Sequence, residues 1–150
     1  MLDVAIEKVG KKNLQKNITL QKGDAENLPF SDNKFDAVSV AFGVRNFENL
    51  EKGLAELRRV VKENSSVYIL EFSKVEGFLA PFYMFYFKNI LPQIGKLVSK
   101  DNRAYTYLPD SVNAFPFGEK MKQILLDTGY SKVEYKKLSL GIATIYKATK

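Results

Sequence analysis

The sequence predicts an α/β fold, because two short apolar strands flank an amphipathic helix. Segments 35–42 and 67–72 are apolar and rich in β-branched residues, and they are too short for helices, so we expect strands buried on both faces. Between them, apolar residues recur at the spacing of one helix face: Phe47, Leu50, Leu54, Leu57 and Val61. A strand, a helix and a strand joined by short loops form a unit whose two strands run parallel.

Charged and polar residues support both ends of this helix. Asn46 is placed to cap its N-terminus, and Glu48 and Glu51 lie in its first turns, where the helix dipole favours negative charge. Basic residues lie near its C-terminus, where the dipole favours positive charge: Arg58, Arg59 and Lys62.

The N-terminal third is expected to contain one helix and one further strand. Residues 1–14 carry apolar side chains at helical spacing, which predicts a helix. Residues 18–21 form a short β-prone run that stops at Gly23-Asp24, and the turn-forming stretch 27–33 follows. We therefore expect a helix, a strand and a loop before the strand at 35–42.

The second half begins with an aromatic segment. Residues 78–97 are expected to be helical, with interruptions at Pro81 and Pro92. The most apolar part, 77–87, contains a proline and is far shorter than the roughly 20 residues that a membrane span needs. It therefore cannot cross a bilayer, although it could lie against one.

The chain is expected to close with a helix and two antiparallel strands. Met121, Ile124 and Leu125 mark a helix that ends at Gly129. The alternating strands 133–138 and 142–148 are separated by only a few residues. A connection this short requires the two strands to be antiparallel.

Composition bounds the chemistry. The chain has 150 residues, 45% hydrophobic and 27% charged, without repeats or linkers, so we expect residues 1–150 to form a single domain. It contains no cysteine and no histidine, which excludes thiol nucleophiles, thiolate zinc sites, the Ser-His-Asp triad and histidine-based metal ligation, and we predict no metal. The net charge is +6, a modest excess that favours anionic surfaces.

Three candidate residues follow predicted strands. Ligands of open α/β sheets bind beyond the carboxyl ends of the strands. Asp24 could accept hydrogen bonds from a ligand or start an Asx turn. Arg45 carries a planar donor fork suited to an oxyanion, with a structural arginine as the alternative. Glu71 could orient another group or be a partly solvated carboxylate. The nine glycines stand at least ten residues apart, so the chain holds no glycine-rich cofactor loop.

Several motifs together resemble one enzyme family. They are Gly-Asp-Ala-Glu-Asn-Leu-Pro-Phe at 23–30, Phe-Gly-Val-Arg-Asn at 42–46 and Leu-Glu-Phe-Ser at 70–73. This combination resembles the ubiquinone/menaquinone biosynthesis C-methyltransferases, which are class I enzymes dependent on S-adenosylmethionine. The resemblance covers essentially the whole chain and includes further matches at 91–95, 105–108, Ser111 and Phe115-Pro116.

The resemblance implies a Rossmann-like sheet of seven strands in the order 3-2-1-4-5-7-6. Family members begin with a strand that carries a glycine-rich cofactor loop, then a helix and a second strand ending in an acidic residue. This chain resembles the part that follows, so we expect an incomplete sheet that lacks the first two strands. The strand at 18–21 would then lie about 14 Å from the strand at 35–41. We expect it to pair anew, to be swapped with another copy in a homodimer, or to leave the chain poorly ordered before residue 34.

The resemblance also implies a cofactor and site residues. S-adenosylmethionine would be held by residues that follow two of the strands: Asp24, Ala25, Ala41, Phe42 and Gly43. Ala41 replaces a serine found in some relatives, which removes one hydrogen bond. The acceptor would be a prenylated quinol, contacted by Arg45 and by Tyr105 and Tyr107, unless these tyrosines are core residues.

The implied mechanism places Arg45 and Asn46 at the reacting ring. Arg45 would stabilise the developing phenolate, directly or through a water, and Asn46 would orient that water or the ring unless it only caps the helix. The aromatic segment 78–87 suits a prenyl tail, or else forms a core or dimer interface.

These features suggest where the protein acts and what else it could be. We expect a cytoplasmic protein with peripheral membrane contact and without nucleic-acid binding, because its lysines are spread along the chain. The alternatives are a catalytically inactive fragment of such an enzyme and a basic lipid-binding module.

Overall fold

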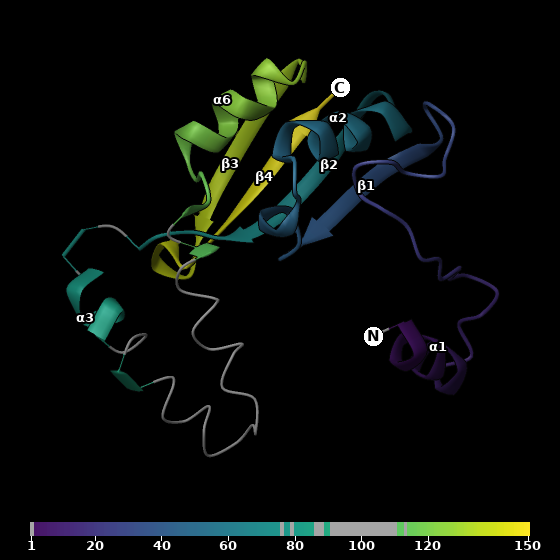
Figure 1. Ribbon diagram of the computed structural model, residues 1–150, viewed down its shortest axis with the longest axis horizontal. Helices are drawn as coiled ribbons and strands as arrows, with labels where there is room; N and C mark the ends of the chain where they lie inside the picture. The colour runs from purple at the N-terminus through teal and green to yellow at the C-terminus, as the bar shows by residue number, and fades with distance from the viewer. Residues whose placement is uncertain (1, 76, 79, 86–88, 91–110, 113) are drawn as a thin grey trace.

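The computed structural model describes residues 2–75, 77–78, 80–85, 89–90, 111–112 and 114–150. A mixed sheet of four strands forms its centre, in the order β1-β2-β4-β3 (Figure 1). The strands are β1 (Phe35–Ala41), β2 (Val61–Phe72), β3 (Lys132–Leu138) and β4 (Ala143–Thr149). The α/β class and the order expected for the last four strands of the seven-stranded sheet are therefore confirmed.

The strand directions follow from the connections between the strands. β1 and β2 are parallel, with Ala41 opposite Leu70, and are joined through a helix. β4 is antiparallel to both β2 and β3, and only the short turn η3 (Ser139–Gly141) separates β3 from β4. β2 begins six residues before the predicted start, at Val61, because α2 passes directly into an extended backbone at this residue. Both the parallel and the antiparallel predictions are confirmed.

Two helices, α2 (Leu50–Val60) and α6 (Glu119–Asp127), cover one face of the sheet (Figure 1). Their apolar sides join one core with the sheet residues that point toward them. Central members of this core are fully buried: Leu54, Ile69, Met121, Leu125 and Tyr146. On the opposite face of β2, Tyr68 keeps 38% of its surface exposed. Leu50, Leu54 and Leu57 of the predicted stripe therefore lie on the inner face of α2, whereas Phe47 precedes the helix and Val61 begins β2.

The cap of α2 differs from the prediction. The helix begins at Leu50, and the side chain of Asn49 accepts a hydrogen bond from the Lys52 amide (3.0 Å), so Asn49 is the N-cap. Asn46 instead ends the short 3-10 turn η1 (Val44–Asn46). The chain is extended at Phe47, which separates this turn from the helix and leaves Asn46 three residues too early to cap it.

Gly53 gives a first testable prediction. A Cβ at this buried position in α2 would lie 2.3 Å from a ring carbon of Phe47. Glycine to alanine in a helix interior normally stabilises by about 1 kcal/mol. Here we expect Gly53→Ala to lower the free energy of unfolding by about 2 kcal/mol, since the Phe47 ring has to move. Urea denaturation of this variant and of the double variant Phe47→Leu/Gly53→Ala checks this, because the smaller side chain should recover most of the loss.

The N-terminal segment corrects one expectation. The helix α1 (Leu2–Lys11) forms within the predicted range, but it buries no residue and lies apart from the sheet (Figure 1). Residues 18–21, expected to be a strand, belong to neither a strand nor a helix. A strand needs a neighbour for its backbone groups, and no described strand lies beside this segment or along the outer edge of β1. Exchange of elements with a second copy stays a prediction.

The remaining helices agree in part with the sequence. α3 (Ala80–Phe85) has Pro81 in its first turn, where the missing N–H costs nothing. Pro92 and most of the predicted helix 78–97 lie outside the described residues. Among the described helices, none has the length and apolar character that crossing a bilayer requires. α6 ends as predicted, with Gly129 at a φ of +98°.

Candidate active site

The candidate site lies where the parallel strands β1 and β2 end side by side. The Phe42 amide donates to the Leu70 carbonyl (2.8 Å), so the pairing continues one residue beyond the end of β1. Residues 43–46, which follow β1, are thereby brought together with residues 71–73 at the end of β2. The structure thus joins the two motifs Phe-Gly-Val-Arg-Asn and Leu-Glu-Phe-Ser, which are 23 residues apart in the sequence, at one edge of the sheet.

Arg45 and Glu71 form a buried ion pair at this edge. Arg45 Nη1 donates to Glu71 Oε1 over 2.5 Å, and it also donates to the Phe42 carbonyl (3.0 Å). The Arg45 side chain is 11% exposed and that of Glu71 is 1% exposed. A pair this well shielded from water interacts far more strongly than a surface pair, and losing either partner leaves a buried charge without compensation.

Glu71 is the anchor of this arrangement. Its carboxylate accepts from the side chain of Arg45, from the Arg45 amide (3.3 Å) and from the Phe72 amide (2.9 Å). Several donors around one carboxylate fix its orientation. Of the two alternatives for Glu71, the structure therefore supports the orienting group and not the partly solvated carboxylate.

The free donors of Arg45 point to a ligand. Nη1 is occupied by Glu71 and Phe42, whereas Nη2 makes no hydrogen bond with any described residue. Within the described part of the chain, Arg45 Nε is the one buried side-chain nitrogen or oxygen without a partner. Unpaired guanidinium donors beside a fixed carboxylate are suited to an oxyanion.

A cavity of about 370 Å³ opens beside Arg45. Its volume is within the range of small-molecule sites. Among the described residues of its lining, Arg45 is the one that carries a charge. The lining also includes Ser111 and these mainly apolar residues: Val44, Phe47, Leu50, Ala114, Phe115 and Pro116. The described lining therefore combines a mainly apolar wall with a single cationic group.

Two aromatic rings lie at the same edge. The rings of Phe42 and Phe72 are 4.5 Å apart between centroids, and the Arg45 guanidinium lies 5.4 Å from the Phe72 ring centre. Phe42 has a φ of +56°, the left-handed region that costs a bulky residue free energy. Backbone strain of this kind concentrates at functional sites, and here it directs an exposed aromatic side chain away from the core.

The other predicted cofactor residues lie in two places. Ala41 ends β1, and Phe42 and Gly43 connect it to η1. Asp24 and Ala25 lie in the loop before β1, where the Asp24 side chain accepts from the Glu26 amide (2.9 Å). This is the Asx turn that the sequence left open as an alternative, and it coexists with an exposed carboxylate. Tyr105 and Tyr107 lie outside the described residues.

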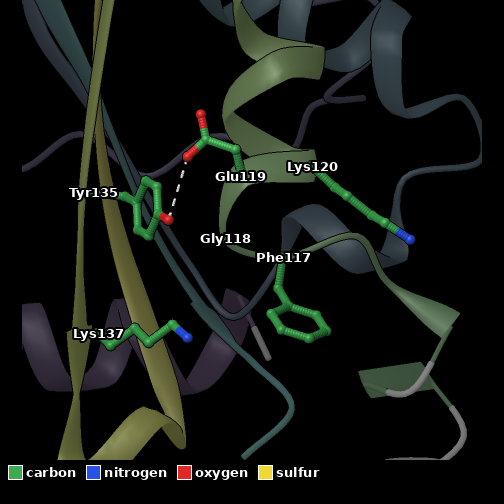
Figure 2. A pocket seen from close by; sticks show the side chains of 6 residues that line it. All are labelled: Phe117, Gly118, Glu119, Lys120, Tyr135 and Lys137. Atoms are coloured by element: carbon green, nitrogen blue, oxygen red, sulfur yellow. Dashed lines mark hydrogen bonds between the residues drawn. The ribbon is translucent and has the colours of Figure 1, made fainter. Parts of the chain in front are cut away.

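A second cavity, of about 380 Å³, lies at the opposite edge of the sheet between α6 and β3 (Figure 2). Tyr135 extends toward Glu119 and donates to its carboxylate over 3.4 Å (Figure 2). A hydrogen bond from Lys122 lowers the pKa of Glu119. None of the predicted site residues that the structure describes belongs to the lining of this cavity.

Sequence reasoning missed a second cluster. Arg59 and Glu56 on α2 hold the loop that carries Asp24 and Ala25, although only the dipole effect of Arg59 was foreseen. Their spacing of three residues, which places both on one helix face, was the available signal.

The fold and this edge define a class of protein. The structure superposes on phosphoethanolamine N-methyltransferase 2 from Haemonchus contortus, solved in complex with S-adenosyl-L-methionine, with a TM-score of 0.69 and 15% identity, covering 100% of this chain and 41% of that one. At this identity the similarity shows the fold alone, which is that of an S-adenosylmethionine-dependent methyltransferase.

The sequence comparisons identify the family. The chain belongs to the ubiE/COQ5 methyltransferase family, whose family model matches residues 1–150. It is 46% identical to the demethylmenaquinone methyltransferase of Bacteroides fragilis, over 100% of this chain and 62% of that protein. It is 48% identical to the ubiquinone/menaquinone biosynthesis C-methyltransferase UbiE of Chromobacterium violaceum, over 85% of this chain and 52% of that protein. The chain therefore spans about 62% of the length of the first of these relatives.

Proposed function

We propose that this chain provides the acceptor side of an enzyme that transfers a methyl group from S-adenosylmethionine to a ring carbon of a prenylated quinol. The observation that carries the proposal is the Arg45–Glu71 pair, in which guanidinium donors without a partner among the described residues lie beside a cavity with a mainly apolar described lining. A quinol ring with an apolar tail has this combination of one ionisable oxygen and a large hydrocarbon surface. The two relatives are named demethylmenaquinone methyltransferase and ubiquinone/menaquinone biosynthesis C-methyltransferase, and these names support this substrate class.

The residues present fit one side of S-adenosylmethionine. Asp24 offers an exposed carboxylate to an amino or hydroxyl group, and Ala41 is small and exposed at the carboxyl end of β1. Phe42 and Gly43 continue this edge toward Arg45. The 150 residues contain no glycine-rich loop, so the affinity of this chain for the cofactor would depend on the residues named here. When bound, the cofactor supplies an electrophilic methyl group on sulfur, which leaves as a thioether.

The chain's own residues act on the acceptor. Deprotonation of a ring hydroxyl raises the electron density at the ring carbon that forms the new bond. In this proposal Arg45 Nη2 donates to the resulting phenolate, while the hydrogen bond from Nη1 to Glu71 holds the guanidinium in position. A preorganised donor of this kind stabilises charge as it develops and needs no reorganisation during the reaction. Asn46, on the same turn, orients the water that takes the hydroxyl proton.

The proposal is tested by binding and by methyl transfer. S-adenosylmethionine is titrated into the protein by calorimetry, and transfer of a labelled methyl group is then measured with a short-chain demethylmenaquinol and with the corresponding ubiquinone precursor. Binding together with transfer to either quinol supports the proposal, and the ratio of the two rates identifies the acceptor. A protein that binds no cofactor, which is the behaviour expected of an inactive fragment, contradicts it. Salt-dependent binding to lipid vesicles without cofactor binding contradicts it as well.

We also propose that α3 contacts a membrane surface, where a prenylated substrate resides. Phe78, just before α3, and Phe82 and Phe85 within it are 85%, 67% and 63% exposed, and the ring centroids of Phe78 and Phe82 are 6.1 Å apart. Exposed aromatic side chains, in a protein with a net charge of +6, suit the interface of an anionic bilayer.

Replacing all three phenylalanines by serine is expected to weaken binding to phosphatidylglycerol/phosphatidylethanolamine vesicles by about tenfold or more, since each buried apolar group contributes to partitioning. Co-sedimentation measures the effect. The matched control replaces Leu2, Val4 and Ile6 of α1 by serine, because these apolar residues are also exposed. Equal losses in the two triple variants would contradict a specific role for α3.

A further inference from the structure

We infer that Arg59 and Glu56 are a positioning pair that holds the segment 24–32 in the geometry required for the cofactor. This inference rests on the proposed function and deepens it, because it assigns the placement of Asp24 and Ala25 to two residues on the outer part of α2. Neither residue belongs to the candidate site. Together the two side chains make four hydrogen bonds to the segment.

Every N–H of the Arg59 guanidinium has an acceptor. Nε and Nη2 donate to the two carboxylate oxygens of Glu56 over 2.7 and 2.8 Å, a bidentate arrangement. Nη1 donates to the Phe30 carbonyl (2.7 Å) and to Asp32 (2.7 Å), and Nη2 also donates to the Leu28 carbonyl (3.0 Å). A guanidinium has five N–H groups, and these five hydrogen bonds use them all.

Glu56 completes the contact from the same helix. Its Oε2 accepts from the Leu28 amide over 2.8 Å, so both backbone groups of Leu28 are bound by one side-chain pair. The hydrogen bond from Arg59 lowers the pKa of Glu56, and the acceptors around Arg59 raise the pKa of the guanidinium. Both groups therefore stay charged throughout the physiological range, and the contact does not depend on pH there.

The segment depends on such contacts because it has almost no regular structure of its own. It contains one isolated bridge, between Asp24 and Asn27, and neither a helix nor a strand. A further side chain ties it to α2: Glu26 accepts from the Asn49 amide (2.8 Å). The Asx turn connects Glu26 to Asp24. Asp24 and Ala25 therefore stand immediately before a series of fixed points at residues 26, 28, 30 and 32.

The fixed segment also forms one wall of a cavity at β1. Ala25, Leu28 and Phe30 line an apolar space of about 360 Å³ together with β1 residues that include Val38 and Val40. Release of the segment would change both this wall and the separation between Asp24 and the end of β1. A ligand that spans the two would lose affinity, whereas the Arg45–Glu71 pair, which shares no hydrogen bond with Arg59, would keep its geometry.

The test is the variant Arg59→Lys in the chain of 150 residues. Lysine keeps the charge but cannot make the bidentate pair or reach several acceptors at once. We expect the Kd and KM for S-adenosylmethionine to rise about tenfold, with kcat and the quinol KM unchanged, because charge-assisted hydrogen bonds that fix the segment are lost. The amides of residues 24–32 should exchange their hydrogens faster, while those of β2 and β4 stay protected.

Arg58→Lys is the matched control. Arg58 is the neighbouring residue on α2, and its Nε donates to the Gly129 carbonyl (2.9 Å), on the side of α6. This variant should leave the cofactor affinity unchanged. The second test variant, Glu56→Gln, removes one charge of the pair and should act in the same direction as Arg59→Lys.

The outcomes separate the inference from the proposed function. Unchanged cofactor affinity or unchanged amide exchange in Arg59→Lys overturns the positioning role. The positioning role is also overturned if kcat and the affinities for both substrates decrease only in proportion to the folded fraction of the variant. Arg59 would then be a purely structural residue. A parent protein that binds no S-adenosylmethionine contradicts the proposed function, and the exchange measurement then decides on its own whether the pair fixes the segment.

Discussion

Replacing Glu71 by alanine is expected to lower the free energy of unfolding by about 3 kcal/mol, the usual cost of removing one partner from a buried ion pair. The Arg45 guanidinium would stay largely buried, and the amides of Arg45 and Phe72 would lose their acceptor at the same time. Methyl transfer should be lost as well, because the guanidinium is no longer fixed at the cavity. Because the chain contains no tryptophan for a fluorescence signal, urea denaturation followed by circular dichroism measures the stability of the variant.

Two further variants make this result specific. Glu71→Gln keeps an acceptor for the amides but not the charge, so it should lie between the parent and the alanine variant. Glu134→Ala removes the exposed partner of Lys132, a surface pair that contributes little to stability. A Glu71→Ala protein as stable as Glu134→Ala would show that the buried pair is not important for folding.

Arg45→Lys is expected to reduce kcat for methyl transfer by about 10²-fold or more, the typical effect of removing one preorganised donor from a developing oxyanion. An ammonium group can still pair with Glu71, but it has no second nitrogen to direct toward the ring oxygen. The fold should therefore survive while the chemical step slows. Single-turnover measurement of labelled methyl transfer separates this step from binding and product release.

The affinity for the cofactor provides the internal control. Kd for S-adenosylmethionine should change little in Arg45→Lys, because the residue faces the acceptor cavity. Arg58→Lys should keep the parental rate. An Arg45→Lys variant with unchanged kcat would contradict the assignment of Arg45 as the group that stabilises the phenolate.

The elements that sequence analysis predicted well are those decided by local patterns. The spacing of Leu54 and Leu57 defined the buried side of α2. The run at 35–42 located β1, but the expected burial on both faces is wrong, because β1 is an edge strand among the described residues and none of its residues is fully buried. The short connection before β4 fixed its antiparallel direction. Loop lengths and apolar periodicity act within a few residues, so the sequence contains the whole signal.

The prediction errors arose where contacts between residues far apart in the sequence determine the local structure. Residues 18–21 have the composition of a strand, but a strand also requires a neighbour, which composition does not reveal. Asn46 and Asn49 are equivalent as capping residues, and the backbone at Phe47 selected Asn49. The Arg45–Glu71 pair joins residues on two different elements, and only the parallel pairing of β1 and β2 brings them into contact.

The placement of this ion pair has a consequence for motion. Leu70 and Glu71 belong to an interior strand: Leu70 pairs with Ala41 on one side, and Glu71 pairs with Thr144 on the other. Amides between two neighbouring strands open rarely, whereas a 3-10 turn such as η1 has few hydrogen bonds to restrain it. When a ligand binds, we therefore expect η1 and the Arg45 side chain to move, while the Glu71 carboxylate on β2 stays in place.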